Sequence, residues 1–146
     1  MIRIPRFLLV AVALALGLGA PGPAHATSIV INNLDGGSEG FNDPTPRSPE
    51  GGNPGTTLGQ QRLFAFQHAA DIWGATLESA IPIRVGAAFV PLSCNATGAV
   101  LGAAGATEVW GNFPNAPYQF TWYPTALASK LAGADMSDPD ETHITA

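Results

Sequence analysis

The clearest periodic pattern of apolar residues in this chain is helical. Five apolar residues recur at intervals of three and four, which places them on one face of an α-helix: Leu63, Phe66, Ala70, Trp73 and Leu77. Thr56 or Thr57 can cap the first turn with its hydroxyl, and Pro82 lies just beyond the pattern. The sequence therefore predicts a helix over residues 57–79 with Trp73 in the core. Phe64 and Ile72 lie off this stripe, so we expect the helix to be covered on more than one side.

Alternating patterns predict strands before and after this helix. Residues 81–90 place an apolar side chain at every second position, which is typical of a strand with one buried face. A β-branched run predicts a first strand at residues 28–31. Between that strand and the helix, residues 32–57 are rich in Gly and Pro. We expect them to form a long surface loop anchored by Leu34 and Phe41.

The second half of the chain gives weaker signals. Residues 122–131 can form a second helix, with Gly133 in the position of a C-terminal cap. Another strand is expected to start at Thr142. Together these elements predict an α+β fold in which the long helix packs on a mixed β-sheet.

The first 26 residues have the pattern of a secretory signal peptide. Arg3 and Arg6 precede an apolar run at residues 7–20, and the sequence Ala24-His25-Ala26 supplies small residues for cleavage after Ala26. The apolar run is shorter than the roughly 20 residues that a membrane-spanning helix needs. We therefore expect a secreted or periplasmic protein with no membrane attachment once the leader is removed.

Charge and composition exclude some functions. The full chain has six Lys and Arg against eleven Asp and Glu, a net charge of −5. Cleavage after Ala26 removes two arginines and no acid, which leaves −7. Such a chain has no basic surface for nucleic acid. Apolar residues make up 46% of the sequence, enough for a core, and a single cysteine excludes a disulfide within the chain.

Two groups of residues have side chains that could carry chemistry. The acidic turn before the last expected strand contains weak candidate metal ligands, which suit calcium although the order of an EF-hand is absent: Asp138, Asp140, Glu141 and His143. His68 and Asp71 lie three residues apart on the long helix. For both groups a solvated polar surface is the favoured interpretation. The chain has neither the Gly-x-Ser-x-Gly of a serine hydrolase nor a His-Glu-x-x-His motif.

The helix and the strand after it resemble the opening of a metzincin-like zinc metallopeptidase domain. The resemblance rests on Ala69-Ala70-Asp71-Ile72-Trp73-Gly74 followed by Ile81-Pro82-Ile83-Arg84-Val85 and Phe89. The Gly/Pro-rich residues 40–46 and 51–63 are similar to those of a family of secreted bacterial proteins. In that family, this region precedes a strand, a cysteine-containing loop and a His-Glu-x-x-His zinc helix.

This resemblance implies a zincin-like N-terminal subdomain at residues 58–146, preceded by a short strand and loop at residues 27–57. Zinc is the cofactor of the full-length family, but no catalytic residue carries over, so we expect no hydrolysis. The expected last strand stops at Ala146, and we expect the C-terminal portion of the same domain to be missing. Cys94 is then either a buried, inert thiol or one half of a disulfide with that missing sequence. The alternative is a complete, non-enzymatic secreted binding or surface module that could bind calcium.

Overall fold

The computed structural model describes residues 26–146, and it confirms the α+β class with two helices and a mixed sheet. The predicted signal peptide lies almost wholly outside the described residues. The long helix α1 spans Leu58–Thr76 and the second helix α2 spans Thr125–Ala132. Among residues 26–146, neither helix combines the length and hydrophobicity needed to cross a membrane.

Helix α1 begins where the sequence predicts and ends three residues earlier. The Thr57 hydroxyl accepts a hydrogen bond from the backbone N–H of Gln60, the expected N-terminal cap. Gln60 in turn accepts a hydrogen bond from the backbone N–H of Thr56 at 2.9 Å. At the other end, Leu77 is the C-cap residue and already has extended backbone angles, well before Pro82.

The buried residues of α1 are small, which corrects the prediction for Trp73. Gly59, Ala70 and Gly74 are buried, whereas Trp73 is 60% exposed. A Cβ atom on Gly59 would lie 2.4 Å from the carbonyl oxygen of Phe41, and one on Gly74 would lie 2.6 Å from that of Thr27. The helix therefore approaches neighbouring backbone more closely than a large side chain would permit, and Trp73 lies beside this contact.

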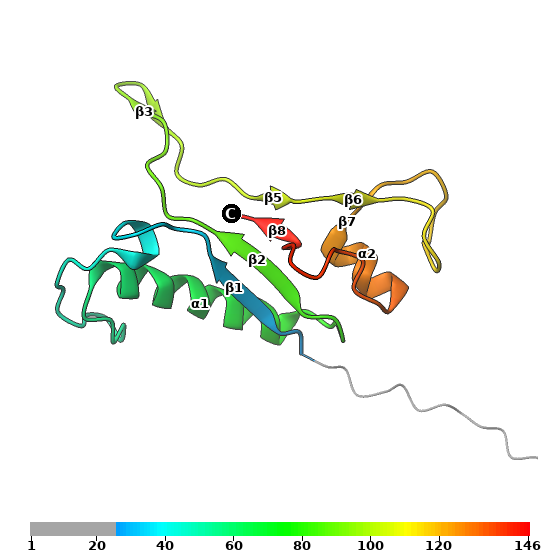
Figure 1. Ribbon diagram of the computed structural model, residues 1–146, viewed down its shortest axis with the longest axis horizontal. Helices are drawn as coiled ribbons and strands as arrows, with labels where there is room; N and C mark the ends of the chain where they lie inside the picture. Colours follow the sequence, from blue (N-terminus) through cyan, green and yellow to red (C-terminus); the bar gives the residue numbers. More distant parts are fainter. Residues whose placement is uncertain (1–25) are drawn as a thin grey trace, which may run out of the picture.

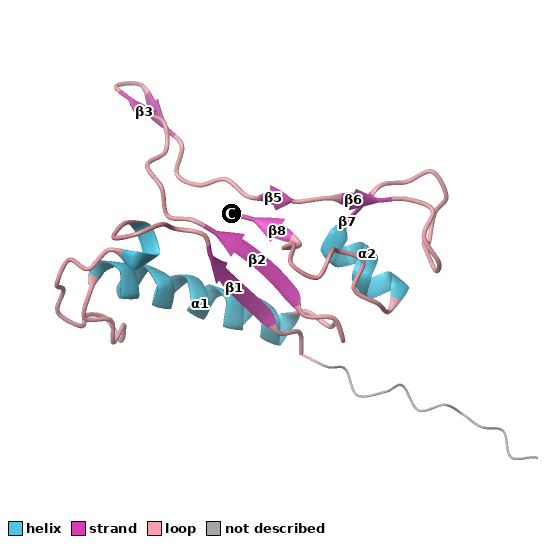
Figure 2. Cartoon of the chain, in the orientation of Figure 1, coloured by secondary structure: helices cyan, strands magenta, loops and turns pink. Residues whose placement is uncertain are grey.

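The main sheet has four strands in the order β1-β2-β8-β5: β1 (Ile29–Asn33), β2 (Ile83–Ala87), β8 (Ile144–Thr145) and β5 (Gly105–Ala106). Strands β1, β2 and β8 are parallel, and β5 is antiparallel to β8. Helix α1 is the crossover between β1 and β2 and lies along them (Figure 1). The secondary-structure view shows β8 between β2 and β5 (Figure 2).

Two apolar clusters stabilise the fold. The first lies between α1 and the sheet and is centred on Phe41, Val85 and Ala87. The second lies under α2 and is centred on Phe113, Tyr123 and Ala128. Here β6 (Val109–Trp110) pairs with β7 (Tyr123–Pro124), and α2 follows directly. Gly133 ends α2 with a φ of 72°, the left-handed cap that the sequence predicts.

The Gly/Pro-rich loop after β1 is fastened to α1 and to the end of β2. Phe41, in the short helix η1 (Gly40–Asn42), is buried as predicted, but Leu34 is 57% exposed. Leu34 is instead held by its backbone, whose N–H donates to the carbonyl of Ala87 at 2.8 Å. The carboxylate of Asp35 accepts hydrogen bonds from the N–H groups of Phe41 at 2.6 Å and Phe89 at 3.0 Å. The anchor is therefore partly polar.

The segment after β2, residues 88–122, supplies β5 to the sheet and Phe113 to the second cluster, but projects from the fold at two places. It carries a hairpin of β3 (Cys94–Asn95) and β4 (Gly98–Ala99), which projects beyond the sheet (Figure 1). Its exposed apolar side chains include Leu101 and Phe120, each more than nine-tenths exposed. The loop between β6 and β7 projects at the opposite end (Figure 1).

Candidate functional site

One hollow in the described residues is an apolar cavity of about 430 Å³ beside α1. It lies against the helix-covered face of the sheet, where Ile29 and Ile31 of β1 and Ile83 and Val85 of β2 alternate inward. The remaining lining side chains are also apolar: Phe66, Ala69, Ala70, Trp73, Leu77, Ala104 and Ile144. The exposure of Trp73 follows from this cavity, because one side of the indole borders an open space.

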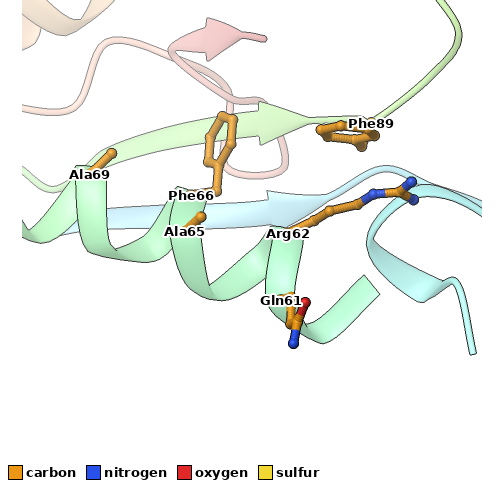
Figure 3. A pocket seen from close by; sticks show the side chains of 6 residues that line it. All are labelled: Gln61, Arg62, Ala65, Phe66, Ala69 and Phe89. Atoms are coloured by element: carbon orange, nitrogen blue, oxygen red, sulfur yellow. The ribbon is translucent and has the colours of Figure 1, made fainter. Parts of the chain in front are cut away.

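A second hollow of about 480 Å³ lies at the first turns of α1, lined by Gln61, Arg62, Ala65, Phe66, Ala69 and Phe89 (Figure 3). Phe66 points from the helix toward β2, Arg62 extends toward the end of β2, and Gln61 points away from both (Figure 3). Phe66 and Ala69 line both hollows. The two hollows therefore adjoin and form a continuous apolar surface along α1.

Arg62 is the charged residue of this surface, and the fold already uses it. Its guanidinium carbon lies 4.3 Å from the centre of the Phe89 ring, a cation–π contact. One terminal nitrogen donates to the carbonyl of Gly40 at 2.9 Å and lies 3.4 Å from the carboxylate of Asp43. Hydrogen bonds from Thr45, helped by Arg62, lower the pKa of Asp43. The surface can therefore hold an apolar group, but it lacks an acid, base or nucleophile to act on one.

The structure places His143 in the interior, away from the other residues of the acidic turn. His143 is 1% exposed, while Asp138, Asp140 and Glu141 are exposed. The Nδ1 atom of His143 accepts a hydrogen bond from the backbone N–H of Arg84 at 3.0 Å. This bond leaves the proton on Nε2, which lies 3.2 Å from the Asp135 carboxylate. Because the lone pair of Nδ1 is engaged, this imidazole does not fit the role of a metal ligand.

Arg84 is the centre of this arrangement, a role that the sequence pattern did not reveal. Its guanidinium contacts the Asp135 carboxylate and the Ser137 hydroxyl, both at 2.6 Å, and its Nε donates to the carbonyl of Glu141 at 2.8 Å. Burial alone would raise the pKa of Asp135, but hydrogen bonds from Ser137 and Arg84 lower it well below its usual value. The sequence did contain one signal for this role of Arg84: it is a charged residue within an otherwise apolar strand.

This cluster is structural rather than catalytic. A serine-protease triad needs the carboxylate on one imidazole nitrogen and the serine on the other. Here Asp135 and Ser137 both face Nε2 of His143, at 3.2 and 3.4 Å. Among residues 26–146, no three His, Cys, Asp or Glu side chains lie together as a metal site would require. The network ties the turn of residues 135–143 to the sheet.

The remaining candidate residues lie apart from one another. Cys94 is exposed in the projecting hairpin, so its thiol is accessible rather than buried. His68 is exposed on α1, and Asp71 accepts a hydrogen bond from Gln67 at 2.8 Å. Ala26, the predicted cleavage residue, pairs with Glu78 beyond the end of α1.

No family model, curated protein or solved structure matches this chain.

Proposed function

We propose that residues 27–146 form the non-catalytic N-terminal part of an exported, zincin-like domain, supplying its sheet and backing helix. The open apolar cavity beside α1 is the observation that carries this proposal. Burying apolar side chains contributes roughly 25 cal/mol per Å² of apolar area, so the part of this sheet face that α1 leaves open favours a further packed element. We assign that place to the C-terminal portion of the same domain.

The topology supports this assignment. The strand with the resembling motif, β2, lies inside the sheet between β1 and β8, as a central strand should. The helix that precedes it packs on β1 and presents Ala69 and Trp73 to the cavity. These are two of the residues that carry the metzincin resemblance.

The chemistry of zinc peptidases is not available to the described residues. Zinc sites of this class need two histidines at helical spacing and a glutamate that activates water. His68 is exposed on α1 and His143 is held by Arg84 and Asp135. The residues present therefore do not fit a zinc ion, and no hydrolytic step is assigned to them.

The purified protein should bind a hydrophobic dye, bind no stoichiometric zinc and leave a casein substrate intact. Ala69→Phe places a ring between the two hollows and should weaken dye binding by about tenfold, or 1.4 kcal/mol. His68→Phe adds similar apolar area one residue away, outside both hollows, and should leave dye binding unchanged. Chelator-sensitive hydrolysis, or equal dye binding by both variants, would contradict the proposal.

The volume of the cavity favours a second candidate function, a secreted module that binds a small apolar ligand. Pockets for such ligands are mostly apolar and measure roughly 300–1,000 Å³, a range that includes this one. Sequencing the gene beyond the codon for Ala146 separates the two. An open frame that encodes a His-Glu-x-x-His helix supports the peptidase scaffold. A stop codon, with a cooperative thermal transition and a ligand seen by native mass spectrometry, supports the binding module.

A further inference from the structure

The backbone nitrogen of Thr27, the first residue after the predicted cleavage site, lies at the C-terminal end of α1. Its N–H group donates to the carbonyl oxygens of Gly74 at 3.0 Å and Leu77 at 3.1 Å. Thr27 is 5% exposed, and its hydroxyl donates to the carbonyl of Ser79 at 3.4 Å. The residue that follows the cleavage site is therefore an integral part of the fold.

The end of α1 lacks a positive charge. The last carbonyls of a helix have no partner within the helix, and their dipoles favour a cation there. No basic residue lies in the last turn of α1, and Glu78 directly follows the C-cap residue Leu77. A positive group at the position of the Thr27 nitrogen would satisfy this end of the helix.

We propose that cleavage after Ala26 creates this cation, so that the new α-ammonium of Thr27 caps the C-terminus of α1. Water adds across the Ala26–Thr27 peptide bond under a signal peptidase. Ala26 leaves with the carboxylate, and Thr27 keeps the nitrogen, which takes up protons to become an ammonium. The neutral N–H that the two carbonyls share is thereby replaced by an ammonium with a separate N–H for each. This inference rests on the proposed export of the protein.

Burial of the new terminus is compatible with its charge. Ala26 is exposed and pairs with Glu78, so its departure opens a route for water to the third N–H of the ammonium. Hydrogen bonds that involve a charged group are about twice as strong as neutral ones. Because Thr27 is buried once the chain folds, the peptidase must act before folding.

Amine labelling of the secreted protein tests the inference. Cleavage after Ala26 leaves two amines, the α-amine of Thr27 and the side chain of Lys130, which is exposed near the end of α2. The full gene is expressed in a secreting host, and the product is treated with an acetylating ester with and without denaturant. Mass spectrometry of the terminal and Lys130 peptides gives the two labelling rates.

We expect the Thr27 amine of the native protein to react about ten- to a hundredfold more slowly than in denaturant, while Lys130 reacts at nearly equal rates. Equal rates for Thr27 in both conditions would overturn the capping. A product that begins at another residue would overturn the cleavage site and the capping together, and an unprocessed product would overturn the proposed export as well.

A second variant tests whether the α-ammonium at Thr27, rather than burial of this residue alone, stabilises the end of α1. Inserting Ser-Gln after Ala26 keeps cleavage at Ala26, because Gln is not a small residue, and so moves the α-amine two residues away and restores a neutral amide at Thr27. We expect its new amine to react as fast as Lys130 and its thermal unfolding midpoint to fall by a few degrees. An unchanged midpoint with a still-protected amine would overturn the proposal.

Discussion

Residues 34–57 and residues 88–122 are both long segments rich in small residues and turns, yet they contact the rest of the protein very differently. The first segment lies on α1 and on the end of β2, and buries Phe41. The second projects from the sheet at two places and exposes Leu101 and Phe120 almost fully (Figure 1). Polar side chains that reach other elements contribute to this difference.

The first segment is fastened to the fold by polar side chains of its own and of α1. Asp35 receives two backbone N–H groups, the amide of Asn53 donates to the carbonyl of Gln61 at 2.8 Å, and that of Gln61 donates to the carbonyls of Ser48 and Gly55. Between residues 88 and 122 the sequence has one charged residue, Glu108. Glycine and proline content therefore does not decide whether a segment packs on the rest of the fold. Hydrogen bonds from its polar side chains to other elements contribute to that packing.

The largest effect is expected where the first segment meets the helix. Gly59→Ala would place a Cβ 2.4 Å from the Phe41 carbonyl, backbone that cannot move independently of the core. We expect a loss of about 3 kcal/mol in the free energy of unfolding, measured with urea. Gly98→Ala is the matched change in the second segment, where nothing lies within 4 Å, and should stay within about 0.5 kcal/mol. Similar losses in the two variants would remove the distinction between the segments.

The turn of residues 135–143 is a third segment, fastened like the first, and its attachment should depend on pH. Asp135→Asn removes the carboxylate from Arg84 and His143 and should cost about 1–2 kcal/mol at pH 7, since the Asp135 side chain is one-third exposed. The folded state lowers the pKa of Asp135, so this stabilisation is present above its unfolded pKa of about 4 and is lost as the pH falls further.

The measurement is urea unfolding of wild type and Asp135→Asn between pH 7 and pH 2, with Asp140→Asn as the exposed control. The gap between wild type and Asp135→Asn should narrow below about pH 4. A gap that stays constant over the whole range would show that the carboxylate charge contributes nothing to fastening this turn.

A smaller effect, of the opposite sign, is expected at the tip of the second segment. Phe120 has a φ of 58°, a conformation that is costly for a residue with a large side chain, and it is 91% exposed. Phe120→Gly keeps the backbone N–H that donates to Asn112 at 2.8 Å. It should raise the free energy of unfolding by about 0.5 kcal/mol. A clear loss of stability would indicate that this ring packs against the fold.

The smallest effect on stability is expected at Cys94, where a substitution should change disulfide formation rather than the free energy of unfolding. The thiol is exposed in the projecting hairpin, so disulfide-linked dimers should form without reductant and run as such on a non-reducing gel. Cys94→Ser should abolish the dimer and leave the unfolding midpoint unchanged. If the wild-type protein does not dimerise, the Cys94 thiol is less accessible in solution than it is in the structure.

Local patterns predict the helices and strands of this fold better than they predict the contacts between them. The helix at α1, the strands β1 and β2, and the Gly133 cap follow from residues close together in the sequence. The buried face of α1 does not, because Gly59, Ala70 and Gly74 make close backbone contacts that a search for large apolar side chains overlooks. The apolar cavity also depends on the order of the strands, which periodicity does not encode.

Contacts between residues distant in sequence account for two further differences between the sequence-based expectations and the structure. The backbone N–H of Arg84, 59 residues earlier in the chain, donates to His143. The residues next to Arg84 or His143 in the sequence do not predict this hydrogen bond. Leu34 was expected to anchor its loop through its side chain, but a backbone bond to Ala87 does so. Propensity describes one residue and its neighbours, whereas these contacts arise when separate segments meet.

The position of β8 inside the sheet has a consequence for the order of folding. The βαβ unit of β1, α1 and β2 can form from one continuous stretch of chain, but the other edge of β2 pairs with β8 only after dozens more residues have been made. At roughly 5–20 residues per second, synthesis leaves that edge unpaired for several seconds. An unpaired parallel edge is a template for aggregation. The second edge of β2 is therefore covered only once β8, the last strand of the described residues, is available to pair with it.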